Sequence, residues 1–183
     1  NVYLTAAELA VIVPIPEAVL DDASYDIMGE VTPRVNEAMG QKVDQAIAFG
    51  ISRPSEWPSD IITLARQAGN NVAASGGVTY DNIMGVDGLI AKVEESGYMV
   101  NGILSSLRTR AALRGLKDTT GRPLFVSDMK GSTPYALDGT PITFDQNGAF
   151  DMSTAQMIAG AWNQAVYSMR QDVTVKILTE ATI

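Results

Sequence analysis

The segment most open to a chemical interpretation is Asp118-Thr119-Thr120-Gly121, inside LRGLKDTTGRPLF (residues 113–125). An Asp before hydroxyl residues and a Gly suits a nucleophilic carboxylate that accepts a phosphoryl group. Such a nucleophile needs a Lys directly after it, but Thr119 takes this position and Arg122 comes four residues after Asp118. The chain also has no nucleotide-binding fingerprint and no partner loops with acidic magnesium ligands. These absences argue against phosphoryl transfer.

Ordinary turn chemistry explains the same segment. Lys117 at the end of a helix interacts favourably with the helix dipole, and Asp118 and Thr119 can bond their own backbone. Gly121 permits a positive φ angle, and Pro123 starts an extended run. We therefore predict that Asp118 is a turn residue between a helix and an extended segment.

The other candidates for chemistry are weaker. The chain has no His and no Cys, which excludes a His base, a Cys nucleophile and a thiolate or imidazole zinc site. The adjacent acids Asp21-Asp22 and Glu94-Glu95 do not face each other on a helix. ASGGVTYD (74–81) lacks the Gly-Lys-Ser/Thr ending of a phosphate-binding loop, and DNIMGVDG (81–88) lacks the ligand spacing of a calcium loop. We predict no catalytic, cofactor-binding or metal-binding residue.

Composition narrows the class of protein further. The chain has 183 residues, 46% of them hydrophobic, which is enough for a core of its own. Its net charge is −8, and no run of consecutive Lys or Arg could neutralise several phosphates. No stretch approaches the roughly 18 apolar residues needed to cross a bilayer. We therefore expect a globular protein that does not bind nucleic acid directly and has no membrane partner.

The first sixty residues predict a short apolar run, a long helix and a boundary. LAVIVPI (9–15), closed by prolines, suits a strand or an extended edge. Apolar residues at three- and four-residue spacing then predict a helix to Phe49, with Asp21, Asp22 or Ser24 as its N-cap. Pro33 predicts a kink, or a short first helix and a new start. GISRPSEWPSD (50–60) has the composition of a domain boundary.

The remaining sequence alternates between helical and strand-like patterns. After a short helix or strand at 61–67, we expect a helix at 80–95 capped by Thr79 and a buried strand at 98–104. A helix then starts at Ser105 or Ser106. Asp138-Gly139 between apolar runs predicts a hairpin, and three β-like runs after residue 154 predict a meander. This order indicates an α+β fold with an α/β insert.

Several stretches also resemble one known family when taken in order. They are the helix entry VPIPEAVLDDASYDI (13–27), the helix exit VDQAIAFG (43–50), LKDTTGRPLF (116–125), LDGTPITF (137–144) and RQDVTVKILTE (170–180). Their order is similar to that in the major capsid proteins of tailed bacteriophages with the HK97 fold. GAWNQAVYS (160–168) departs from the Gly-Asp-Phe that many relatives carry there.

The resemblance implies an HK97-like α+β fold in two domains. The peripheral domain, a long helix plus antiparallel strands, would comprise residues 1–57 and 149–183, and an α/β axial domain, residues 58–148, would be inserted between them. The family's N-terminal arm, extended loop and C-terminal end would lie outside this sequence. The chain is therefore expected to be a fragment that forms monomers or small oligomers.

The resemblance also implies a structural role without enzymatic activity. The intact protein would assemble with itself, as hexamers and pentamers, into the icosahedral head of a phage or prophage, in the host cytoplasm. A scaffold, a portal and a maturation protease are further expected partners, and DNA would be enclosed without sequence-specific contact. Two alternatives stay open at this point: an encapsulin-like nanocompartment shell, and a small hydrolase with convergent carboxylates in a deep pocket.

Overall fold

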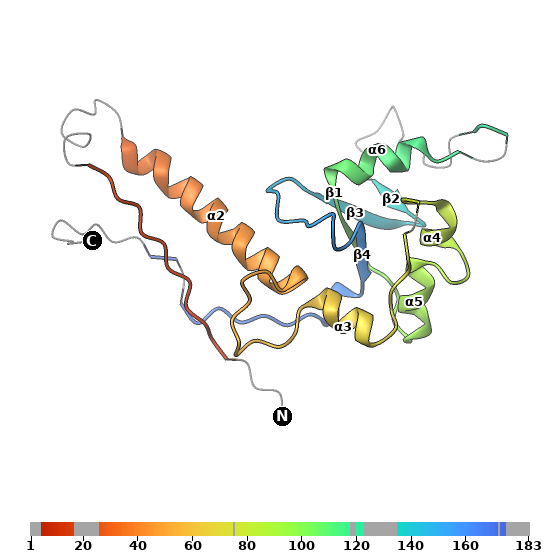
Figure 1. Ribbon diagram of the computed structural model, residues 1–183, viewed down its shortest axis with the longest axis horizontal. Coiled ribbons are helices and arrows are strands. Elements are labelled where there is room, and N and C mark those ends of the chain that lie inside the picture. Colours follow the sequence, from red (N-terminus) through yellow and green to blue (C-terminus); the bar gives the residue numbers. More distant parts are fainter. Residues whose placement is uncertain are drawn as a thin grey trace.

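The computed structural model describes residues 5–16, 26–74, 76–117, 120–122, 135–171 and 173–174 (Figure 1). A long helix, α2 (Ile27–Phe49), lies on one side of the molecule, and a four-stranded sheet with the shorter helices lies on the other. No helix among the described residues is long and apolar enough to cross a membrane.

Helix α2 begins and ends where local chemistry dictates. Asp26 is the N-cap, and its carboxylate accepts a hydrogen bond from the amide of Gly29. The prediction of Asp21, Asp22 or Ser24 as the cap was wrong, because Asp26 lies one residue before the first helical turn. The helix runs through Pro33 without a new start and ends at Gly50, whose φ of 70° few other residues adopt readily.

The predicted boundary at 50–60 contains no helix or strand, and Asp60 caps the helix that follows it, α3 (Ile61–Gln67). The side chain of Arg53 donates to the carbonyls of Trp57 and Pro58, which holds the segment in a compact turn. Burial raises the pKa of Asp60, but hydrogen bonds from Thr63 and the charge of Arg53 outweigh it, so the pKa lies below its usual value.

The single helix predicted over 80–95 is two helices, α4 (Tyr80–Met84) and α5 (Leu89–Glu95). Thr79 caps the first as predicted. The break comes at Gly85 and Gly88, where added Cβ atoms would lie 2.4 Å and 2.8 Å from the nearest backbone atoms. A single helix would place Val86 on the same face as the buried Ile83 and Ile90, but after the break Val86 is 91% exposed.

The sheet has the strand order β2-β3-β1-β4, formed by β1 (Gly102–Ser106), β2 (Ala136–Leu137), β3 (Thr140–Asp145) and β4 (Met157–Gly160). The β2–β3 hairpin is confirmed, with positive φ at both Asp138 and Gly139. Strand β1 starts four residues later than predicted, and β3 pairs with it in parallel.

The predicted meander was wrong over the residues that can be compared. Strand β4 pairs with β1, far away in sequence, and a 3₁₀ turn, η1 (Trp162–Gln164), follows it. Residues 165–171 form neither helix nor strand, and most of VTVKILT lies outside the described residues. The run 9–15 also forms no strand, although Figure 1 shows it as extended chain.

One face of the sheet carries the core. Ile103 of β1 and Ile142 of β3 are register partners, so they point to the same face, and they pack with Ile83, Ile90 and Leu113. Helices α4, α5 and α6 (Leu107–Gly115), the last capped by Ser106, thereby cover this face. The opposite face presents Leu104 and its partner Thr143.

Candidate functional site

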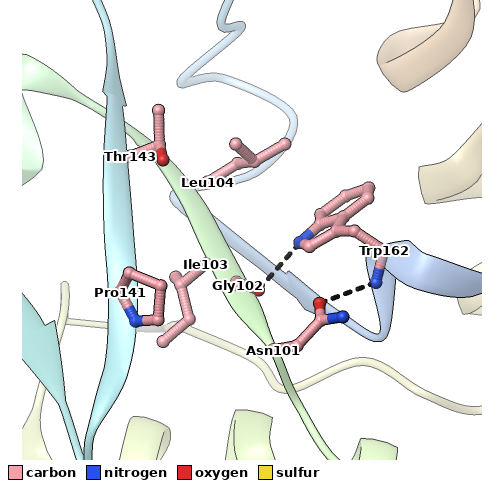
Figure 2. A pocket seen from close by; sticks show the side chains of 7 residues that line it. All are labelled: Asn101, Gly102, Ile103, Leu104, Pro141, Thr143 and Trp162. Atoms are coloured by element: carbon pink, nitrogen blue, oxygen red, sulfur yellow. Dashed lines mark hydrogen bonds between the residues drawn. The ribbon is translucent and has the colours of Figure 1, made fainter.

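A hollow lies on this opposite face of the sheet, beside the indole of Trp162 (Figure 2). Strand β1 and Pro141 and Thr143 of β3 form its floor, and Trp162 stands at one side. Its seven lining residues are Asn101, Gly102, Ile103, Leu104, Pro141, Thr143 and Trp162.

Two hydrogen bonds fix Trp162 against β1. Its indole Nε1 donates to the carbonyl of Gly102 at 2.8 Å, and its backbone N–H donates to the Asn101 side chain at 2.8 Å. Position 102 must be Gly for this contact, because a Cβ there would lie 2.8 Å from the indole Cδ1. Gly160 is the next close neighbour, since a Cβ there would lie 3.6 Å from the indole.

The residues that line this hollow are suited to packing against another side chain. Its lining contains no carboxylate, no Lys or Arg and, apart from the hydroxyl of Thr143, no group that could act as a nucleophile. Within the described ranges, no three acidic side chains come together as a metal site either. The arrangement can receive an apolar side chain beside an aromatic ring, and it offers nothing for proton transfer.

A second arrangement, the loop 145–150, joins the sheet to the long helix. The Asp145 carboxylate accepts from the amides of Asn147 and Phe150, so the loop is held by its own side chains. Asn147 then donates to Asp44 of α2 at 3.3 Å, and Phe150 meets Phe49 edge-on with ring centroids 5.2 Å apart. The C-terminal half of α2 is thereby attached to the sheet.

The following loop, 151–156, fastens α3 and α6 to the same region. Hydrogen bonds from Ser153 and Thr154 hold the pKa of Asp151 below its usual value and fold the turn around its carboxylate. Arg66 of α3 donates to the Thr154 carbonyl at 2.8 Å.

On the sheet side, the same loop is held by two buried hydroxyls. Ser105 and Thr109 both donate to the carbonyl of Gln156, at 2.7 Å and 3.3 Å. Each buried hydroxyl therefore has a partner, as burial requires. Together the two loops make one joint between α2, α3 and the sheet.

Comparisons with known proteins identify the family. The sequence matches the phage capsid family over residues 1–183. The chain belongs to the phage capsid family.

Individual relatives agree with this assignment. The major capsid protein of Staphylococcus phage 80alpha is 24% identical over 177 residues, which cover 97% of this chain and 51% of that protein. A structure from Microbacterium phage Oxtober96 superposes with a TM-score of 0.72 at 29% identity, covering 83% of this chain and 50% of the other. One from Mycobacterium phage Cain reaches 0.67 at 34% identity, covering 81% and 47%. The chain therefore spans about half the length of these relatives, and the HK97-like α+β fold is confirmed.

In this capsid-family chain, the structure describes only some of the residues singled out from the sequence. Asp118 falls outside the described residues, as do Asp21 and Asp22, so the turn interpretation of Asp118 stays a prediction. Gly121 does have a positive φ of 84°. Gly76 and Gly77 also have positive φ, a backbone conformation that glycine adopts readily in turns.

Sequence reasoning missed Trp162 and both loops of the joint. Trp162 lies within a stretch predicted as strand, and its contact with Gly102 joins residues 60 positions apart. The turns at Asp145 and Asp151 have only a weak signal in the sequence, in DQNG (145–148) and DMST (151–154), because Asp followed by small polar residues favours such turns.

Proposed function

We propose that this chain forms much of a structural subunit of a tailed-phage head, which works by self-association. The observation that carries the proposal is the family match over the whole chain. The relative from phage 80alpha is itself a major capsid protein. The intact protein would close into an icosahedral shell through hexamers and pentamers, because repeated copies of one surface pair generate closed symmetric assemblies.

The site geometry supports a contact role without catalysis. A shell subunit needs a fixed angle between its parts, and the joint at 145–156 supplies bonds to α2, α3 and α6 from one short stretch. The hollow at Trp162 offers apolar and aromatic surface with no acid–base group in its lining. A hydrolase with convergent carboxylates would require a different lining there.

We further infer the domain division 1–57 with 149–183, and 58–148. Figure 1 supports it, since residues 5–16 and 165–171 lie on the same side of the sheet as α2, away from α4 to α6. Strand β4 belongs to the 149–183 piece yet pairs with β1. The β1–β4 ladder would therefore join the two domains, beside the joint at 145–156.

The same proposal covers location and partners. The subunit would be assembled in the bacterial cytoplasm and end in the virion, with a scaffold, a portal and a protease assisting. Packaged DNA would be enclosed without sequence-specific contact. The net charge of −8 fits this, because an acidic protein repels nucleic acid and lets it slide.

Electron microscopy of the gene product that carries this sequence, expressed in bacteria, tests the proposal. We expect closed particles of uniform size built from five- and six-fold clusters. Particles that package protein cargo and never DNA in an infected or induced host would indicate a nanocompartment shell. A soluble monomer at all concentrations, with or without the other head proteins, would refute the proposal.

A further inference from the structure

Positive charge is concentrated on one helix of this acidic chain. Five of the 13 Lys and Arg lie between residues 108 and 122, where Asp118 is the only acid. Arg108, Arg114 and Lys117 are exposed, and none of them forms an ion pair with a carboxylate of the described residues. Arg110 is different, because its guanidinium lies 4.2 Å from the ring centroid of Tyr135.

The exposed face of α6 combines these charges with small apolar groups. Thr109 and Leu113 point into the core, so helical spacing places Leu107 and Ala111 on the opposite, exposed face between Arg108 and Arg114. We call Leu107, Arg108, Ala111 and Arg114 of α6, together with the exposed Lys117 that follows the helix, the basic surface.

Helices α4 and α5 present the opposite charge. We call the following exposed residues the acidic surface: Asp81, Val86, Asp87, Glu94, Glu95 and Met99. Val86 and Met99 are 91% and 84% exposed, so both apolar side chains are available for a contact. Lys92 pairs with Asp87 and Glu95, whereas Asp81 and Glu94 form no ion pair within the described part of the chain.

Within the described part of one copy, no ion pair joins the basic surface to the acidic surface. Helix α6 contacts the inner strands β1 and β3, while α5 contacts the edge strand β4. Both helices pack on the core face of the sheet, and the view in Figure 1 draws the strands between them.

Some of these charges also stand at the unfavourable ends of their helices. Arg108 lies in the first turn of α6, which has no acidic residue, and Glu94 and Glu95 lie in the last turn of α5. The helix dipole favours the reverse arrangement, so local stability does not explain these positions.

We propose that the basic surface of one copy docks on the acidic surface of a second copy. This deepens the proposed function and rests on it. The contact is head-to-tail, because the two surfaces differ, and its repetition builds a ring when the rotation between neighbouring copies closes. Apolar groups at its centre, Leu107 and Ala111 against Val86 and Met99, would lie inside a charged rim, as in other protein interfaces.

Cysteine trapping tests the geometry, because the chain has no native Cys. Ala111→Cys chains are mixed with Val86→Cys chains, one of them carrying a mass tag, and oxidised at low salt and high protein concentration. We expect the mixed disulfide dimer to exceed either homodimer at least about fivefold. Ala38→Cys, at an exposed position of α2, is the matched control and should give only background with Val86→Cys.

Charge reversal tests the energetics. Arg108→Glu/Arg114→Glu makes both surfaces acidic, and Asp81→Lys/Glu94→Lys cancels the negative charge of the acidic surface, while the starting charge of −8 keeps each variant negative overall. In sedimentation at low salt, each variant alone should self-associate at least about tenfold more weakly than the wild type. An equimolar mixture should regain wild-type association, because each then offers the other an opposite surface. Raising the salt to about 0.5 M should weaken the wild-type contact.

Arg34→Glu/Lys42→Glu on α2 changes the net charge as much as Arg108→Glu/Arg114→Glu does but lies outside both surfaces, so it should associate like the wild type. A trapped yield at the control level, or no recovery in the mixture, would overturn the proposal. If shells nevertheless form from the intact gene product, the proposed function stands and only this contact is wrong. Loss of binding to a double-stranded DNA oligonucleotide in Arg108→Glu/Arg114→Glu, with self-association unchanged, would assign the basic surface to nucleic acid and also overturn it.

Discussion

Substitution of Gly102 by Ala tests the contact that shapes the hollow. The new Cβ would lie 2.8 Å from Cδ1 and 3.1 Å from Nε1 of Trp162. The clashing atoms belong to a side chain, so the indole swings away more cheaply than the strand moves. The Nε1–Gly102 hydrogen bond and the packing of the ring on β1 are then lost.

The magnitude follows from these two losses. One hydrogen bond contributes about 0.5–1.5 kcal/mol net, and the lost ring packing adds about 0.8 kcal/mol for each methylene-sized area that is uncovered. We expect Gly102→Ala to lower the free energy of unfolding by about 1–3 kcal/mol. The loss should not exceed that of Trp162→Ala, because a displaced indole can forfeit only the contacts it made.

Urea unfolding followed by circular dichroism measures these values without depending on tryptophan fluorescence. Gly40→Ala is the matched control, since nothing lies within 4 Å of its new Cβ in the interior of α2. It should stabilise the protein by about 0.5–1 kcal/mol. In the Trp162→Ala background, Gly102→Ala should become neutral or slightly stabilising. Equal effects of Gly102→Ala with and without Trp162 would refute the reasoning.

Substitutions at three further positions have expected effects on stability that urea unfolding can check. Asp60→Ala should cost about 0.5–2 kcal/mol through loss of the α3 cap, whereas Asp60→Asn keeps the cap and should cost less. Because the folded-state pKa of Asp60 is lowered, the stabilisation from its ionised carboxylate is present above the unfolded-state pKa and disappears as the pH falls through the folded-state pKa. The difference in the free energy of unfolding between the wild type and Asp60→Asn should therefore shrink between pH 6 and pH 3. Gly139→Ala should cost about 1 kcal/mol because φ is 74° there, and an unchanged midpoint would contradict the hairpin geometry. Asp118→Asn should cost less than about 1 kcal/mol, and trapping of a phosphoryl group on Asp118 would contradict its assignment as a turn residue.

Local chemistry in the sequence determined the elements whose signals lie within a few residues. Thr79 and Ser106 cap their helices as predicted, and Asp138-Gly139 forms its hairpin. These features depend on hydrogen bonds and backbone preferences of neighbouring residues, so the sequence alone reveals them. The ordered series of turn motifs also indicated the family, because the motifs mark turns that follow one another in the same order in its members.

Only the tertiary structure decided which distant segments meet. β4 had the composition of a meander strand, but its pairing with β1 is set by packing across more than 50 residues. The contact of Trp162 with Gly102, the attachment of Asn147 to Asp44 and the separation of α6 from α5 likewise depend on long-range placement. The hydrophobic effect is non-directional. An apolar run therefore predicts that a segment is buried, but it does not predict which other segment covers it. The basic helix shows the same limit: its cations are spaced too far apart to form a run, and only the folded helix brings Arg108 and Arg114 onto one exposed face.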